Sequence, residues 1–277
     1  VRVFGTIGWI LAGLLISFAF KWDSIANIGQ GMLSNTFTMV AVASAVLGVF
    51  SFTLPKTPPS AAKGEKGTIR DILGLDALKL LKDRNFLVFF LSSVLICIPL
   101  AFYYQNISPF LTEYKVENST AWASLGQISE VGFMLLLPFF FKKYGFKKTI
   151  LFGMLAWGIR YALFAYGNTG DLFFMLVIGI ALHGICYDFF FVSGQIYTDS
   201  KAGEKVKSAA QGLITLATYG IGMLVGFWVA GKIVDKNILA DGTHSWQDVW
   251  LFPALFALGV LVLFALFFKE ETVEYKA

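Results

Sequence analysis

A carboxylate lies in the middle of an apolar stretch long enough to cross a membrane. Asp188 stands within HGICYDFFFVSGQIY, which runs from His183 to Tyr197. An ionisable side chain in hydrocarbon costs roughly 3 kcal/mol, so such residues usually face a polar cavity, pair with an opposite charge or carry protons. Asp188 is therefore the first candidate for proton coupling.

The same stretch offers polar and aromatic side chains for binding a ligand. At about 100° per residue, one helical face is shared by His183, Tyr187, Phe190 and Gly194. This face combines a hydrogen-bonding ring, aromatic surface and a small residue that leaves room. Asp188 lies about 100° from Tyr187, so we expect it at the flank of this face, directed toward a neighbouring helix.

Two further polar clusters occur at helical spacing. Gln127 and Glu130 are three residues apart, and an amide beside a carboxylate presents donors and acceptors together. Arg2, Thr6 and Trp9 follow i, i+4, i+7 spacing, which predicts a stripe of cation, hydroxyl and indole. The alternatives are a structural ion pair for Glu130, and an interfacial Arg2 beside a Trp9 that only packs.

One arginine needs a partner, and one proline marks a further candidate site. Arg160 is the only Arg deep within an apolar stretch, so charge accounting predicts that it pairs with Asp188. Pro99 interrupts another apolar stretch, and its helical face also carries Tyr103 and Asn106 as weaker candidates. They belong to the run FYYQN (Phe102 to Asn106), whose aromatic residues fit equally well in an interfacial belt.

Membrane-spanning helices must position all of these side chains. Hydrophobic residues make up 57% of the chain, charged residues only 14%, and the mean hydropathy is +0.69. A soluble domain carries about 25% charged residues. Segments of about 20 apolar residues predict spans over 3–20, 36–54, 86–110, 121–141, 149–166, 172–197, 208–231 and 250–268. The predicted class is an all-α integral membrane protein with eight transmembrane helices.

The positions of Lys and Arg predict the topology. These residues concentrate in the 55–85, 142–148 and 199–207 connections and in the C-terminal tail. The positive-inside rule places those segments, including the C-terminus, in the cytoplasm. Residues 55–67 are rich in Pro, Gly and Lys, which predicts a linker. Apolar spacing in 69–85 predicts a short amphipathic helix on the cytoplasmic surface, and the alternative is a structural clamp.

Several other functions lack the residues they need. The chain has two histidines and no HExxH, CxxC, GxSxG or phosphate-binding loop, so we predict no enzyme activity, cofactor or metal. Basic residues do not cluster on a soluble face, so no nucleic-acid partner is expected. Cys97 and Cys186 both fall inside predicted spans and are expected to be free thiols.

Six sequence blocks resemble the nucleoside:proton symporter family of the major facilitator superfamily. They are RVFGTIGW (2–9), SLGQISE (124–130), LPFFFKKYGFKK (137–148), GIRYALFAYG (158–167), HGICYDFFFVSGQIY (183–197) and SAAQGL (208–213). The first block is also similar to the related oligosaccharide:proton symporters. The resemblance covers spans five to twelve of that fold, so we expect a C-terminal fragment that normally partners missing N-terminal helices of the same protein.

The resemblance implies a domain division and a function. Residues 1–54 would be the last two helices of the N-terminal bundle, 55–85 the central linker, and 86–277 the C-terminal six-helix bundle. The implied function is nucleoside uptake with protons across the inner membrane, by alternating access around a midplane cavity. Substrate contacts would come from Arg2, Thr6, Trp9, Gln127, Glu130, His183 and Tyr187, and coupling from Asp188, Glu130 and Arg160. The alternatives are an oligosaccharide symporter and a passive nucleoside uniporter.

Overall fold

The protein is a bundle of long apolar helices. The computed structural model describes residues 2–56 and 74–271, and helices are its dominant element. Within those residues the only β pairing is a bridge between Ile238 and His244. The all-α expectation is confirmed, because apolar helices satisfy their own backbone hydrogen bonds in hydrocarbon.

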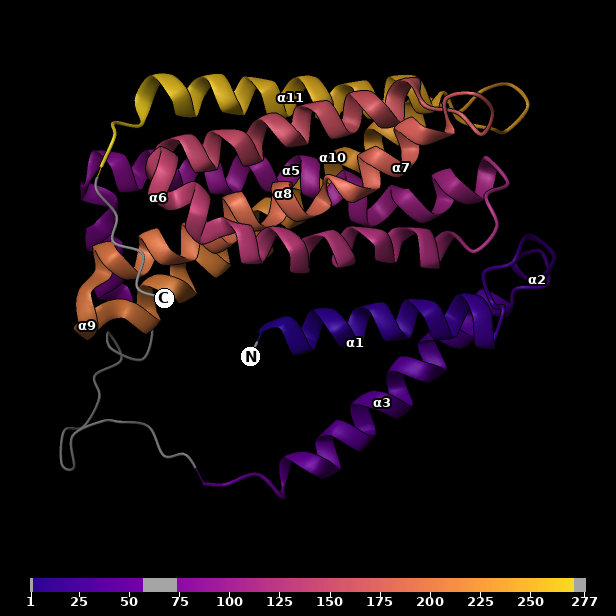
Figure 1. Ribbon diagram of the computed structural model, residues 1–277, viewed down its shortest axis with the longest axis horizontal. Helices are drawn as coiled ribbons and strands as arrows, with labels where there is room; N and C mark the ends of the chain where they lie inside the picture. The colour runs from indigo at the N-terminus through magenta and orange to yellow at the C-terminus, as the bar shows by residue number, and fades with distance from the viewer. Residues whose placement is uncertain (1, 57–73, 272–277) are drawn as a thin grey trace.

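Figure 1 shows the order of the helices along the chain. The N-terminal segment comprises α1 (Arg2–Leu14), the π-helical η1 (Leu15–Ala19), α2 (Ile25–Ile28), η2 (Met32–Ser34) and α3 (Asn35–Ser51). The remainder comprises η3 (Leu75–Lys82), α5 (Arg84–Glu113), α6 (Ser119–Tyr166), α7 (Phe173–Ala181), α8 (His183–Tyr187), η4 (Asp188–Val192), α9 (Ser193–Thr215), η5 (Leu216–Gly222), α10 (Met223–Lys236) and α11 (Trp246–Phe267).

Two glycines reverse the chain within continuous helical segments. Gly145 has φ 76° and ψ 177°, and Gly203 has φ 66° and ψ 171°. Because L-residues rarely adopt positive φ, glycine suits both turns. Gly145 divides the 48-residue α6 into two arms, which we call the first arm and the second arm.

The observed helices agree with the eight predicted spans. Six described helical segments are long and apolar enough to cross a membrane, and Val3–Ala19 is a shorter apolar helix. Since one of the six is α6 with its two arms, these segments account for all eight predicted spans. The boundaries at 54–55 and 85–86 between the proposed domains remain a prediction.

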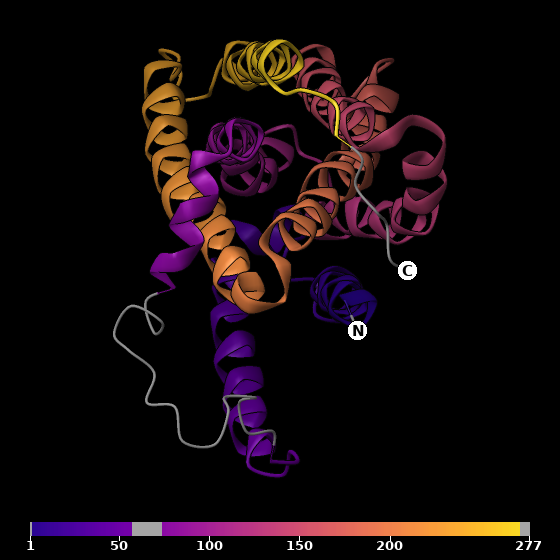
Figure 2. The same ribbon diagram turned by 90° about the vertical axis from the view of Figure 1, so that its left-hand side faces the viewer.

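The helix α3 stands apart from the packed bundle (Figure 2). None of its most apolar window is buried, and large side chains such as Phe37 and Val49 are exposed. By contrast, α11 and α8 both pack extensively against α6. The exposed apolar surface of α3 suits contact with lipid or with other apolar helices.

Small residues allow α5 and α10 to approach closely. A Cβ added at Gly226 would lie 2.6 Å from the Cβ of Ala101, and one at Gly222 would lie 2.7 Å from the Cβ of Cys97. Both glycines therefore face α5 at distances that a side chain would prevent. Their four-residue spacing is the small-xxx-small pattern of packed membrane helices.

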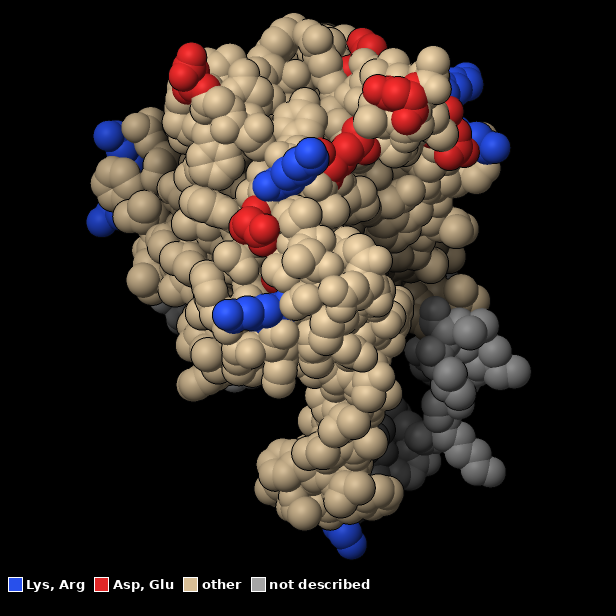
Figure 3. Space-filling view, turned by 90° about the vertical axis from the view of Figure 1, so that its right-hand side faces the viewer, with Lys and Arg blue, Asp and Glu red and all other residues tan. Residues whose placement is uncertain are grey.

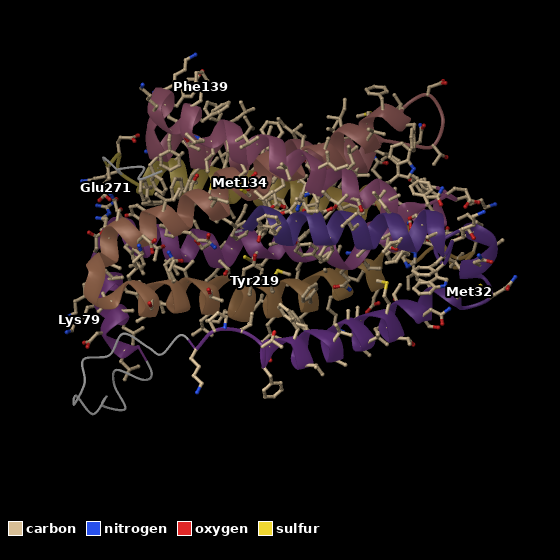
Figure 4. The ribbon with its side chains drawn as sticks, turned by 60° about the horizontal axis from the view of Figure 1, so that its bottom comes forward. Met32, Lys79, Met134, Phe139, Tyr219 and Glu271 are labelled. Atoms are coloured by element: carbon tan, nitrogen blue, oxygen red, sulfur yellow. The ribbon has the colours of Figure 1, made fainter. Side chains whose placement is uncertain are left out.

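Polar contacts connect three segments at the end of the bundle that carries Lys79 and Glu271 (Figure 4). Lys201 on α9 lies 3.0 Å from Asp83 and 2.9 Å from Glu271, which follows α11. Asn85 donates to Glu271 at 2.7 Å. The connection 75–82 and the end of α11 therefore lie at the same end of the molecule, as the topology prediction requires.

The predicted amphipathic helix is described only in part. Its first residues, 69–73, lie outside the described residues. The described part is the 3-10 helix η3, which packs against α9 and α5 and buries Ala77 completely. This part of the segment therefore packs on the protein itself, as a structural clamp would, and its position relative to the membrane remains a prediction.

Asp83 caps α5, and its charge should make stability depend on pH. Its carboxylate accepts from Phe86 N–H at 2.9 Å. Burial raises the pKa of Asp83, but hydrogen bonds from Phe86 N–H and Lys201 outweigh that effect, so the pKa lies below its ordinary value. A lowered pKa stabilises the fold above the unfolded value of about 3.9, and this contribution is lost as pH falls through the folded-state value.

We therefore expect Asp83→Ser to lower the melting temperature at neutral pH, with a difference from wild type that shrinks in acid. Serine keeps a capping acceptor but does not titrate. The measurement is thermal unfolding in detergent between about pH 7 and about pH 3. A difference that stayed constant across this range would contradict a stabilising charge at Asp83.

Candidate functional site

A cavity of about 280 Å³ lies where four helices meet. Pockets for small ligands begin near about 300 Å³, so the volume suits a compact organic molecule. Its lining combines residues of α1 (Gly5, Thr6, Trp9), α5 (Tyr104), the first arm of α6 (Gln127, Glu130) and α8 (His183, Tyr187). No described group of three or more His, Cys, Asp or Glu residues is arranged to hold a metal ion.

The α1 and α6 side of the cavity carries mixed hydrogen-bonding groups. Thr6 Oγ1 donates to Glu130 Oε1 at 3.4 Å, which links the two helices. Gln127 Oε1 is buried and has no hydrogen-bond partner among the described residues. A hydroxyl, an amide and a carboxylate together offer both donors and acceptors to a polyhydroxylated ligand.

Aromatic rings surround the other side. Tyr104 meets the ring of His183 edge-on at 6.4 Å between centroids, and Tyr187 lies 5.6 Å from it. The Tyr187 hydroxyl is hydrogen-bonded to the Tyr219 hydroxyl of η5. Trp9 is 58% exposed, so its indole is accessible. Aromatic faces of this kind can stack on a planar heterocycle.

A buried arginine lies behind His183. Arg160, on the second arm of α6, is completely buried, and its Nη1 lies 2.9 Å from His183 Nδ1. The Arg160 Cζ lies 3.6 Å from the ring centroid of Tyr103, and that ring stacks on His183 at 5.3 Å. His183 therefore lies between the cavity and a cationic, aromatic layer.

The helices α1 and α6 are in close contact beyond one end of the cavity. A Cβ added at Gly13 would overlap Ser124 Oγ. Past α1, the buried Asp23 accepts from Ser17 Oγ at 2.7 Å and from Thr120 N–H at 2.8 Å. Acidic and basic side chains are interspersed at this end of the molecule (Figure 3).

We expect Asp23→Ala to loosen this closed end. Hydrogen bonds to a charged acceptor each contribute about 1.5–3 kcal/mol, so their loss should increase opening at least about tenfold. The readout is the modification rate of Ser124→Cys by a thiol reagent, with and without Asp23→Ala. Asp171→Ala, at an exposed carboxylate in the 168–172 turn, is the matched control. Equal rates with alanine and aspartate at position 23 would show that Asp23 does not hold the helices together.

The structure places most predicted binding residues around the cavity. Thr6, Trp9, Gln127, Glu130, His183 and Tyr187 all line it. The side chain of Arg2 lies outside the described residues. Tyr103 and Asn106 are buried but do not line the cavity, because the helical phase of α5 directs the neighbouring Tyr104 there. Tyr104 was missed, although the FYYQN run already contained the signal.

Glu130 lines the cavity, whereas the other two coupling candidates are buried away from its surface. Asp188 and Arg160 are both completely buried, and neither is among the lining residues. No ion pair within 4.0 Å joins them in the described residues, and the described hydrogen bond of Arg160 goes to His183. Asp188 also begins the π-helical η4, so a constant 100° per residue does not hold beyond Tyr187.

Comparison with known proteins assigns the family. The family model described as "Nucleoside H+ symporter" matches residues 1–273. The chain is 44% identical to the putative nucleoside transporter YegT of Escherichia coli K12, covering 100% of this chain and 66% of that protein. It is 31% identical to the xanthosine permease of the same organism, covering 100% of this chain and 67% of the permease.

A solved structure agrees with these relatives. The crystal structure of the nucleoside transporter NupG superimposes with a TM-score of 0.74 at 30% identity, covering 98% of this chain and 67% of that one. The chain thus spans about two thirds of the length of the relatives it matches. The helices, the match over nearly the whole sequence and the similar structure lead to one conclusion: this multi-pass membrane chain belongs to the nucleoside H+ symporter family.

Proposed function

We propose that the protein takes up nucleosides together with protons across the bacterial inner membrane, with its C-terminus in the cytoplasm. The observation that carries this proposal is the composition of the cavity. Aromatic rings on one side suit a planar base, and Thr6, Gln127 and Glu130 on the other side suit ribose hydroxyls. Family membership and the names of the relatives support the same substrate class.

The packing of α1 on α6 supports alternating access around this cavity. The two helices are in close contact near Gly13 and Asp23, beyond one end of the cavity. Such a contact is expected at the closed end of a transport pathway. Transport would then require the α1–α6 contact to open while the opposite end closes.

Proton coupling is assigned to Asp188, with Glu130 as the second candidate. Asp188 is buried directly after Tyr187, which lines the cavity, so its protonation state can influence the wall of the site. Glu130 lines the cavity itself and accepts from Thr6 on α1. Protonation of either carboxylate would remove a buried charge and favour a different packing of the helices around it.

The test is uptake of radiolabelled uridine by the full-length protein in proteoliposomes, with and without an imposed pH gradient. We expect accumulation above the external concentration only when the gradient is present. Equal uridine uptake with and without the pH gradient would indicate a passive uniporter. If disaccharides, and not unlabelled uridine or adenosine, were the substrates that compete for uptake, the protein would be an oligosaccharide symporter.

A further inference from the structure

The contact between Arg160 and His183 fixes the position of a proton. The Arg160 Nη1 to His183 Nδ1 distance is 2.9 Å. A guanidinium only donates hydrogen bonds and stays protonated in proteins, so Nδ1 of His183 must be the acceptor. A neutral imidazole whose Nδ1 accepts carries its proton on Nε2.

The environment of Arg160 keeps this contact in place. The guanidinium lies 3.6 Å above the ring of Tyr103 and 5.6 Å from both Trp157 and Phe164. Arg160 is completely buried, and no ion pair within 4.0 Å joins it to a carboxylate among the described residues. Cation–π contacts, the His183 acceptor and the neighbouring Cys186 thiol therefore surround the guanidinium.

His183 is the only one of these residues that reaches the cavity. It lines the site, whereas Arg160 and Tyr103 lie behind it. Nε2 of His183 makes no hydrogen bond to any described residue, which leaves its N–H for an occupant of the cavity. The surrounding rings of Tyr104 and Tyr187 place this donor on the aromatic side, where the proposed base would stack.

We infer that Arg160 is a positioning residue that holds His183 in the Nε2-protonated tautomer, so that His183 presents a fixed donor to an acceptor atom of the nucleoside base. This inference rests on the proposed function for the identity of the ligand. It gives the site a donor that complements Glu130, which only accepts when ionised. Nucleosides with a carbonyl or ring nitrogen at this edge would satisfy the donor.

The charged and titratable neighbours of His183 come from every segment packed around it. They are Arg160 on the second arm of α6, Glu130 on the first arm, Tyr103 and Tyr104 on α5, and Cys186, Tyr187 and Asp188 on its own segment. Among them Arg160 is permanently cationic, and it donates its hydrogen bond directly to His183 Nδ1. A second proton at Nδ1 would have to displace the guanidinium, so the donor should persist in acid.

The direct test is ¹⁵N NMR of histidine-labelled full-length protein in lipid nanodiscs, from about pH 8 to about pH 5. A His183→Gln sample assigns the signals. We expect Nε2–H with an unprotonated Nδ1 throughout this range in the wild type. In Arg160→Gln, mixed tautomers should appear, because no guanidinium then donates to Nδ1. An Nδ1–H tautomer or an imidazolium in the wild type would overturn the inference.

Equilibrium binding of uridine tests what the fixed donor does. At a fixed pH, Arg160→Gln should lose about threefold to tenfold in uridine affinity, with partial rescue by Arg160→Lys. If Arg160→Gln does not fold, His183→Gln, whose amide nitrogen reaches the Nε2 position, should bind better than His183→Asn. An equal loss of uridine affinity in His183→Gln and His183→Asn would contradict a donor at Nε2. A wild type that has the Nε2–H tautomer but binds no uridine would refute the proposed function while leaving the tautomer established.

Discussion

Asp188→Asn should bind nucleoside but fail to accumulate it against a concentration gradient. Asparagine has nearly the same shape as protonated aspartate, but it cannot gain or lose a proton. With one proton per nucleoside, each unit of pH gradient supports about tenfold accumulation, because it is equivalent to about 1.4 kcal/mol. The variant should lose this entire driving force and only equilibrate uridine across the membrane.

The measurement combines uridine binding with uptake by proteoliposomes under an imposed pH gradient. Asp235→Asn is the matched control, because Asp235 is an exposed carboxylate at the end of α10. It should accumulate uridine like the wild type. Wild-type accumulation by Asp188→Asn would remove Asp188 from the coupling step, and the same experiment on Glu130→Gln would then test the second candidate.

A single methyl group at Gly184 should disrupt the site. A Cβ there would lie 2.6 Å from the backbone C and O of Ser129 and 2.7 Å from the backbone N of Glu130. Because these are backbone atoms of a packed helix, α8 must move away from α6. This displacement would separate His183 and Tyr187 from Gln127 and Glu130, and overpacking of this kind costs about 1–3 kcal/mol.

We therefore expect Gly184→Ala to weaken uridine binding at least about tenfold and to lower the melting temperature by several degrees. Gly259→Ala provides a matched control, since a Cβ at Gly259 on α11 would meet nothing within 4 Å. That control should be neutral or slightly stabilising, because alanine favours helix by up to about 1 kcal/mol. If both variants behaved alike, the close approach of α8 to α6 would not be important for binding.

The sequence identifies much of the cavity because it combines helical periodicity with costly polar residues. Thr6 and Trp9 share one face of α1, and Gln127 and Glu130 share one face of α6, so their spacing places each pair together. His183 and Tyr187 are also spaced by one turn. The structure brings these six side chains to one cavity. Spacing within a helix cannot show which helices are neighbours, so the joint site needed the tertiary structure.

The incorrect details have local physical causes. Whether Tyr103 or Tyr104 lines the cavity depends on the rotation of α5 about its axis. Packing of Tyr103 against Arg160 and His183 sets this rotation. The sequence predicted an ion pair between Arg160 and Asp188, because a buried cation needs a partner. Aromatic faces and an imidazole acceptor can also stabilise a cation, and Arg160 has both.

The sequence alone determined the membrane class, the eight spans, the two chain reversals that contain Gly145 and Gly203, and the residue types that bind polar ligands. Hydrophobic length and the cost of buried charge act locally along the chain, so they can be read without knowing the packing. The tertiary structure decided that Arg160 contacts His183, that Tyr104 lines the cavity and that α1 meets α6 at Asp23. These contacts join residues distant in sequence, and they depend on how small residues let neighbouring helices approach.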